Sequence, residues 1–469
     1  MMKVKAIVIL LFICGSAFGQ GIDSLQLGFN EYLGYVKKYH PIAKQAELNI
    51  AVGQASLMKA RGGFDPKIEV DYDRKKLKGI EYWDILNATF KIPTWYGIEL
   101  KADFEQNEGD FLNPERTVPT DGLFSAGVSF SVAQGLLINE RMAMVKKAKF
   151  LREQTKADRD LAVNQVLFNA SVAYFNWLQA YIEQQIYSNF LENARVRFEG
   201  VKQSALVGDR ATIDTVEAKI TYQNRALSLE QARIHLAKRR LALSNFLWVN
   251  EVPVELQPEV RPQTTITADE VDTLLEINGF QPNLLALEAH PKLQSMNFKI
   301  EGLKVEKRLK ANKLLPQIDL QYNFLTETPE VVRSFSTADY KGGVMFRFPL
   351  FLRKERGDLK LAKLKLQDAN FDYESTAIQL QNNINALSQE LQSFNRQNTL
   401  VDDIVINYET LLAAEERKFS FGESSLFLVN SRENKLIEAT LKQNEIQNKF
   451  FTTKAKLFKE LAINPSALQ

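Results

Sequence analysis

The chain has 469 residues, with 59 Lys and Arg against 57 Asp and Glu, so its formal net charge is only +2. A chain of this length commonly folds into roughly two to four globular domains, and the balanced charge excludes the basic footprint of a nucleic-acid-binding protein. Phe is abundant and Pro is scarce, with 30 and 14 residues, so the composition is that of a folded chain rather than a disordered one.

Residues 1–19 have the pattern of a secretory signal peptide: a positive start, an apolar stretch, and small residues just before the expected cleavage point at Gln20. The alternative, a retained anchor, is disfavoured because the apolar stretch is too short to span a bilayer as a helix. Cys14 is the only cysteine. It is an alternative site of lipid attachment, which the bulky Ile13 before it disfavours. After cleavage at Gln20 the chain would have no thiol for a disulfide or a metal site.

Two parts of the chain repeat each other. His40-Pro41 returns as His290-Pro291, and Pro66 returns as Pro316 at the same separation. Repetition of this kind predicts a duplicated architecture rather than a string of unrelated domains. We expect the first repeat over residues 20–248, a connection over 249–283 and the second repeat over 284–469.

Each repeat is expected to place its elements in the same order, from helix through strands to a very long helix and a returning helix. In the first repeat we expect helices over 23–61, strands over 66–133, a long helix over 140–207 and a returning helix over 209–248. In the second we expect helices over 284–313, strands over 316–350, a long helix over 354–421 and a returning helix over 424–461. The proline-rich connection should hold one short helix near 268–277.

The strand segments alternate with a period of two, so each has one apolar and one polar face. This pattern is typical of the wall of a transmembrane β-barrel, and equally of an antiparallel sheet that covers a soluble core. No stretch after residue 20 has 18 consecutive apolar residues, so any membrane crossing would have to be made by strands. The apolar positions are Ile68, Val70, Tyr72, Leu86, Ala88, Phe90, Ile92, Ile98, Leu100, Ala102, Phe104, Phe124, Ala126, Val128, Phe130, Ile318, Leu320, Tyr322, Phe324, Val344, Phe346 and Phe348.

The two long helices contain no Pro, and each would be about 100 Å long at a rise of 1.5 Å per residue. Apolar residues recur in both at spacings of three and four, which predicts a coiled coil. Each long helix ends at a glycine, Gly208 or Gly422, that can supply the left-handed conformation of a tight turn. Thr212 and Ser425 are expected to cap the returning helices.

The residues that enzymes and metal sites need are missing from the sequence. There are only three histidines, and His40 and His290 occupy equivalent helix breaks, where a structural role is expected. The sequence has no HExxH, no Walker loop, no GxSxG and no GxGxxG. We therefore expect no catalytic, cofactor-binding or metal-binding residues, and no enzyme activity.

The whole mature chain resembles the TolC family of outer-membrane efflux and secretion channels. Besides the duplication, the resemblance rests on Leu315-Pro316-Gln317-Ile318 before a strand, and on the ends of the long helices. Residues 417–422 look like the family's aromatic-x-x-Gly turn. Residues 208–217 are similar to the stretch that lines the periplasmic entrance in that family.

The resemblance implies a fold that is mostly α-helical with a β-barrel portion. It implies a homotrimer whose strands form one shared barrel in the outer membrane of a Gram-negative bacterium, in contact with lipid, and whose helices form a coiled-coil tunnel in the periplasm. The implied function is a passive conduit of a tripartite efflux or type I secretion system, with a periplasmic adaptor and an inner-membrane pump as partners. The alternative is a soluble periplasmic coiled-coil scaffold protein.

By the same resemblance, Gly208 and Gly422 mark the periplasmic tip. The family commonly has acidic residues shortly after the second glycine, where this sequence has Leu428 and Ser431. In the first repeat the corresponding acids are present, although they are equally well interpreted as first-turn acids that face the helix dipole. The candidate entrance-lining residues are Arg210, Asp214 and Glu217.

The strand region of the first repeat is longer than that of the second. The extra length holds two alternating runs, Tyr82–Ile92 and Ile98–Phe104, joined by the turn-forming segment Pro93–Gly97. This hairpin can join the wall, in which case the first repeat supplies four strands and the second two. A trimer would then have 18 strands, where the family pattern implies 12, and a wider barrel. The alternative leaves the hairpin outside a 12-stranded wall.

Overall fold

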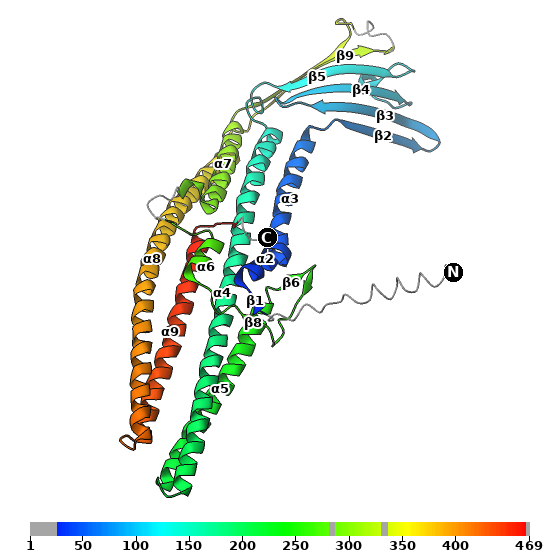
Figure 1. The fold of residues 1–469 in the computed structure, drawn as a ribbon. Coiled ribbons are helices and arrows are strands. Elements are labelled where there is room, and N and C mark those ends of the chain that lie inside the picture. The colour runs from blue at the N-terminus through cyan, green and yellow to red at the C-terminus, as the bar shows by residue number, and fades with distance from the viewer. Residues whose placement is uncertain (1–25, 281–286, 330–335, 466–469) are drawn as a thin grey trace, which may run out of the picture. The chain divides into compact units, whose positions relative to one another are not determined.

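The computed structural model describes residues 26–280, 287–329 and 336–465 (Figure 1). The chain divides into two compact units. We call Met1–Gln45, Ala162–Leu285 and Asn382–Gln469 the hairpin unit, and Ala46–Leu161 and Ala286–Gln381 the sheet unit. The expected signal peptide, with Cys14, lies outside the described residues.

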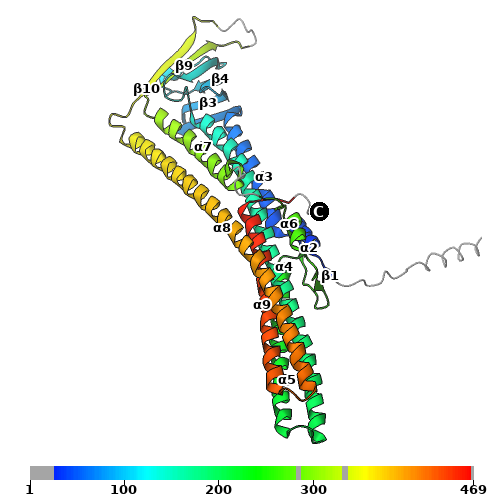
Figure 2. The ribbon, with the colours of Figure 1, turned by 60° about the vertical axis from the view of Figure 1, so that its left-hand side comes forward.

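The sheet unit contains a six-stranded antiparallel sheet in the order β10-β9-β5-β4-β3-β2, and its strands lie side by side in Figures 1 and 2. The first repeat supplies four strands and the second repeat two, joined by the pairing of β5 with β9. The extra hairpin of the first repeat is thus part of this sheet, which is the first of the two alternatives left open by the sequence. The strands are β2 (Lys67–Leu77), β3 (Ile80–Pro93), β4 (Ile98–Glu108), β5 (Leu123–Ser131), β9 (Gln317–Thr326) and β10 (Tyr340–Arg347).

The strands of this sheet turn most of their apolar side chains to the same face, as two neighbouring rows of paired residues show. One row crosses all six strands with only apolar or aromatic residues, and the adjacent row contains four lysines. Because side chains of adjacent rows point to opposite faces, the sheet has one continuous apolar face and one polar face. The apolar row is Ile68, Phe90, Ala102, Ala126, Phe324 and Tyr340. The polar row is Lys67, Lys91, Lys101, Gly127, Asn323 and Lys341.

Helices adjoin the sheet within the same unit. They are most of α3 (Pro41–Arg61), α7 (Pro291–Asn312) and the first parts of the long helices α4 (Glu140–Leu206) and α8 (Arg353–Ser420). Leu57 of α3 packs on Val145 and Ala148 of α4 in one buried cluster. Ala143 of α4 packs with Val305 of α7 in another. Short 3-10 turns lie at Gly62–Phe64, Pro114–Arg116 and Leu287–Ala289.

His40 and His290 start equivalent helices. Each ring accepts a hydrogen bond through Nδ1 from the backbone N–H two residues later, at 3.2 Å from Ile42 and 3.1 Å from Lys292. Burial lowers the pKa of His40, which favours the neutral ring that such an acceptor requires. The structural role expected for this pair is confirmed.

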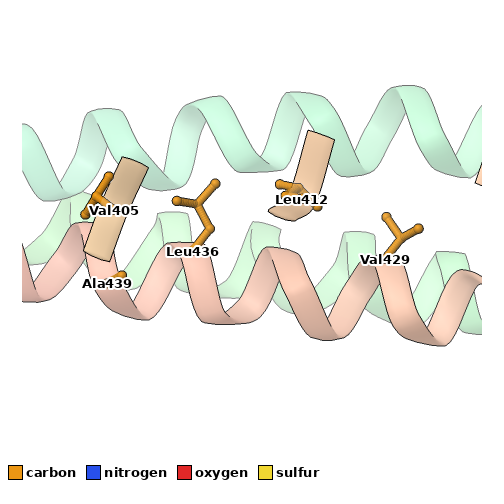
Figure 3. Close-up of a cluster of buried hydrophobic side chains, with 5 residues drawn as sticks. All are labelled: Val405, Leu412, Val429, Leu436 and Ala439. Carbon is orange, nitrogen blue, oxygen red and sulfur yellow. The ribbon is translucent and has the colours of Figure 1, made fainter. Parts of the chain in front are cut away.

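The hairpin unit is built from two helical hairpins. The later part of α4 turns into α5 (Thr212–Ser244), and the later part of α8 turns into α9 (Leu426–Glu460). Apolar side chains seven residues apart pack along the helices, as expected for a coiled coil. Figure 3 shows one such buried cluster, formed by Val405 and Leu412 of α8 with Val429, Leu436 and Ala439 of α9.

The smaller elements of the hairpin unit include strands that the sequence did not predict. Gln26–Leu27 (β1) pairs in parallel with Arg261–Pro262 (β8), and the first helix, α2, therefore begins only at Phe29 rather than at the expected Asp23. The connection also contains a two-stranded hairpin and the short helix α6. The hairpin strands are β6 (Trp248–Val249) and β7 (Val252–Pro253), and α6 spans Ala268–Leu274. The first helix, α2, spans Phe29–Tyr39. In the described part of the chain, no helix is both long enough and apolar enough to cross a bilayer.

Candidate functional site

The most distinctive local geometry of the hairpin unit is at the two turns that end the long helices. Gly208 and Gly422 have φ values of +86° and +78°, in the left-handed region. In both turns the residue after the glycine donates to a carbonyl five positions earlier: Asp209 to Ser204 and Glu423 to Lys418, each at 2.9 Å. This is the pattern of a Schellman motif. Because nothing lies within 4 Å of a side chain added at either glycine, the backbone angle alone requires glycine there.

The returning helices begin differently in the two repeats. The hydroxyl of Ser425 accepts a hydrogen bond from the Leu428 N–H at 3.3 Å, so the expected cap of α9 is confirmed. The expected cap of α5 is wrong, because Thr212 is already the first helical residue and Ala211 stands at the cap position without a side-chain hydrogen bond. Asp214 lies in the first turn of α5 instead. A carboxylate there is favoured by the helix dipole.

The candidate residues of the first turn contact the second hairpin. The Arg210 guanidinium lies over the Phe419 ring, with 3.9 Å from Cζ to the ring centroid, and Nη2 donates to the Phe419 carbonyl at 3.3 Å. Glu217 accepts a hydrogen bond from the side-chain amide of Asn430 at 3.2 Å. Arg210 thus contacts α8 and Glu217 contacts α9. Asp214 is half-buried in the first turn of α5.

Close to these turns, a buried carboxylate joins three helices. Glu433 of α9 is fully buried, and its two oxygens bind Arg197 of α4 at 3.0 Å and Arg225 of α5 at 3.2 Å. Arg197 also pairs with Glu416 of α8 at 2.9 Å. A buried charge is tolerated only when it is paired and hydrogen-bonded, and here two guanidiniums supply that pairing. We call Arg197, Arg225, Glu416 and Glu433 the tip network.

Sequence reasoning missed Glu433 because it considered only the acids that follow each glycine directly. A signal was nevertheless present. Leu426, Val429 and Leu436 are buried on α9 at spacings of three and seven, and the charged Glu433 falls within the same stripe. A charge at an inward heptad position indicates a specific buried partner.

Among the residues described, no group of three or more His, Cys, Asp or Glu could hold a metal ion. The third histidine, His235, pairs through Nδ1 with Glu183 at 3.1 Å on a partly exposed helix surface.

Comparison with known proteins gives a family match within the second repeat and a fold match over most of the chain. Residues 284–461 match the model of the outer membrane efflux protein family. A comparison with curated proteins gives no match. Among solved structures the chain is similar to CusC, with 14% identity, a TM-score of 0.68 and coverage of 93% of each chain. It is also similar to the CmeC outer-membrane channel of Campylobacter jejuni, with 14% identity, a TM-score of 0.64 and coverage of 92% of this chain and 85% of CmeC. The open-state MtrE outer-membrane channel of Neisseria gonorrhoeae gives the same identity and TM-score, with coverage of 92% and 88%. At these identities the likeness establishes the fold.

Proposed function

We propose that this chain, whose second repeat carries an outer membrane efflux protein domain and whose fold is that of TolC-like outer-membrane channels, is the outer-membrane channel of a tripartite efflux or type I secretion system. It serves as a passive conduit rather than as an enzyme. The observation that carries the proposal is the six-stranded sheet, with its continuous apolar face on one side and its polar face on the other. A wall between lipid and water needs these two faces.

The apolar face is open to its surroundings in the single chain. Ile68 and Val344 are each 75% exposed and Phe346 is 66% exposed, on the two outermost strands. Monomeric soluble proteins rarely expose a continuous apolar surface of this kind. Contact with the outer-membrane lipid would cover it, which favours the channel over the alternative of a soluble periplasmic scaffold.

We place the periplasmic entrance at the turns of Gly208 and Gly422, with Arg210, Asp214 and Glu217 as lining residues. Large apolar side chains are exposed around both turns. A periplasmic adaptor that links the channel to an inner-membrane pump would bury them, because apolar side chains concentrated at one place mark an interaction surface. They are Leu206, Val207 and Ile213 in the first hairpin, and Phe421 and Phe427 in the second.

The tip network gives this entrance a means of staying closed. It joins the α4–α5 hairpin to the α8–α9 hairpin, so the two can separate only if Glu433 loses Arg197 and Arg225. In a homotrimer, three such separations would widen the entrance. Cargo passage then depends on a partner whose binding offsets the cost of breaking the network.

Membrane fractionation tests the proposal. Outer membranes from cells that express the full chain are washed with alkaline carbonate and then extracted with detergent. The channel should remain in the membrane after the wash, leave it only with detergent, and form ion-conducting pores in planar bilayers. Release of the chain by carbonate alone would support the scaffold function instead. Chemical cross-linking in cells before detergent extraction, followed by mass spectrometry, should identify the adaptor and the pump.

A further inference from the structure

The six-stranded sheet has two open edges, β2 and β10. We propose that β10 of one copy pairs with β2 of the next, so that three copies close a single sheet of 18 strands, three times six. The inference rests on the proposed homotrimeric membrane channel. The physical reason is that open edges expose unpaired backbone groups, which cannot remain unpaired in the hydrocarbon of a bilayer.

The direction of the edge strands allows this pairing. All neighbouring strands of the sheet are antiparallel, and the number of strands is even. The two edge strands of one chain therefore run in opposite directions, and β10 would meet the β2 of a second copy as an antiparallel partner. The chain enters β2 directly after the helical segment that ends at Phe64 and leaves β10 just before α8 begins at Arg353. The end of β10 nearest the helices would thus lie beside the end of the neighbouring β2 nearest the helices.

The faces of the edge strands also match. Val70 shares the apolar face with Ile68 of β2, and Val344 shares it with Tyr340 of β10, because residues two or four apart point to the same side. Met345 directly follows Val344 and points to the opposite face. Pairing of β10 with β2 would therefore continue both the apolar and the polar face across the junction between copies.

The β2–β3 hairpin is a full member of the wall. Its turn is formed by Lys78 and Gly79 with φ values of +52° and +81°, as in a two-residue type I′ turn. On the other side β3 pairs with β4 without interruption from Asp84 opposite Glu108 to Pro93 opposite Glu99. A 12-stranded wall that excluded β3 and β4 would have to break the pairing of β4 with β5. One that kept β4 would have to break the pairing of β3 with β4, and its edges in each chain would be β4 and β10.

The consequence is a wider pore. With strands about 4.8 Å apart and tilted by about 40°, a closed sheet of 12 strands has a backbone diameter of about 24 Å, and one of 18 strands about 36 Å. Walls of 16 to 18 strands enclose a water-filled channel. We infer that this channel passes solutes of larger cross-section than a 12-stranded channel of the same helical architecture.

Disulfide trapping in outer membranes distinguishes the 18-stranded wall from the 12-stranded wall. The test uses the full chain, whose only cysteine is Cys14 in the expected signal peptide. Val70→Cys is combined in turn with Gly342→Cys, Val344→Cys and Phe346→Cys, which lie on the same face and cover the possible registers. Val70→Cys with Met345→Cys is the matched control on opposite faces. Leu100→Cys with Val344→Cys reports the β4–β10 junction of a 12-stranded wall.

We expect at least one of the three same-face pairs to convert most of the protein into covalent dimers and trimers on non-reducing gels, because its Cα atoms would lie within the 4.4–6.8 Å that a disulfide requires. The opposite-face control should remain monomeric. Trapping through Leu100, or a purified trimer in which no β2–β10 pair reacts, would overturn the 18-stranded wall and leave the proposed channel intact. A chain that is monomeric by native mass spectrometry in detergent would count against the proposed homotrimer itself.

Discussion

Arg197 of α4 and Glu433 of α9 form an ion pair, with 3.0 Å between Nη2 and Oε1, in which the carboxylate is completely shielded from solvent. The second carboxylate oxygen faces Arg225 of α5 at 3.2 Å, so one negative charge holds two positive charges from the other hairpin. Removing the acid leaves two largely buried guanidiniums close together, which is costly in a low-dielectric surrounding. Loss of the tip network should therefore lower the stability of the folded chain and make the proposed entrance open more easily.

We predict that Glu433→Gln weakens the packing of the two hairpins by roughly 3–5 kcal/mol, the usual cost of breaking a buried pair from one side. In the channel this should appear as a larger mean conductance in planar bilayers and as greater sensitivity of cells to bulky antibiotics. Glu438→Gln is the matched control, since Glu438 pairs only at the surface of the same helix, with Lys435 at 2.8 Å. Unchanged conductance and sensitivity in Glu433→Gln, with normal expression, would show that the network does not restrain the entrance.

The turn glycines give a second prediction, which concerns stability. Gly208→Ala and Gly422→Ala should each destabilise the fold by about 1–2 kcal/mol, because an alanine at positive φ is strained even where space is free. Gly200→Ala is the control: Gly200 is inside α4 with nothing within 4 Å of an added side chain, so alanine should stabilise the helix by up to about 1 kcal/mol. Thermal unfolding in detergent, monitored by circular dichroism, measures the change in stability of each variant. Equal shifts at the three positions would contradict the role of the backbone angle.

Much of the fold follows from local rules that can be read in the sequence. Positive φ at a helix end requires glycine, so Gly208 and Gly422 mark the ends of the long helices to within a few residues. Strand alternation likewise predicts the apolar face of the sheet. The tip network could not be predicted in this way, because the partners of Glu433 are more than 200 positions distant in the chain. The two-residue strand β1 was missed for the same reason: its partner β8 is set by tertiary packing and not by any local pattern.

An ion pair between α4 and α7 gives a prediction about pH. Hydrogen bonding to Lys147 lowers the pKa of Glu306, with 2.8 Å between the charged atoms. A carboxyl group whose pKa is lower in the folded state contributes stability above its unfolded pKa, and this contribution is lost as the pH falls through the folded pKa. The pair is partly exposed, so we expect it to be worth less than about 1 kcal/mol at neutral pH.

A double-mutant cycle with Glu306→Gln and Lys147→Met measures this coupling. The coupling free energy should be present at pH 7 and should disappear as the pH falls below the normal Glu range, near 4. It should also weaken in high salt, because solvent-accessible charges are screened. A coupling that is the same at pH 3 and pH 7 would contradict the assignment of the pair.

The last prediction concerns the two faces of the edge strand β10. Val344 lies on the apolar face and is 75% exposed in the single chain, whereas the next residue, Met345, points to the polar face. A lysine on the lipid side of a membrane wall costs roughly 2–4 kcal/mol near the middle of the bilayer. We therefore expect Val344→Lys to reduce the amount of trimer inserted in the outer membrane at least several-fold, as measured by heat-modifiable migration on gels. Met345→Lys, one position away on the same strand, should insert at the level of the unchanged chain, because water can solvate its charge on the polar face. If the amount of inserted trimer fell equally in both variants, the cause would be the edge position of β10 and not the lipid-facing side. If both variants inserted normally, the apolar face would not be in contact with lipid.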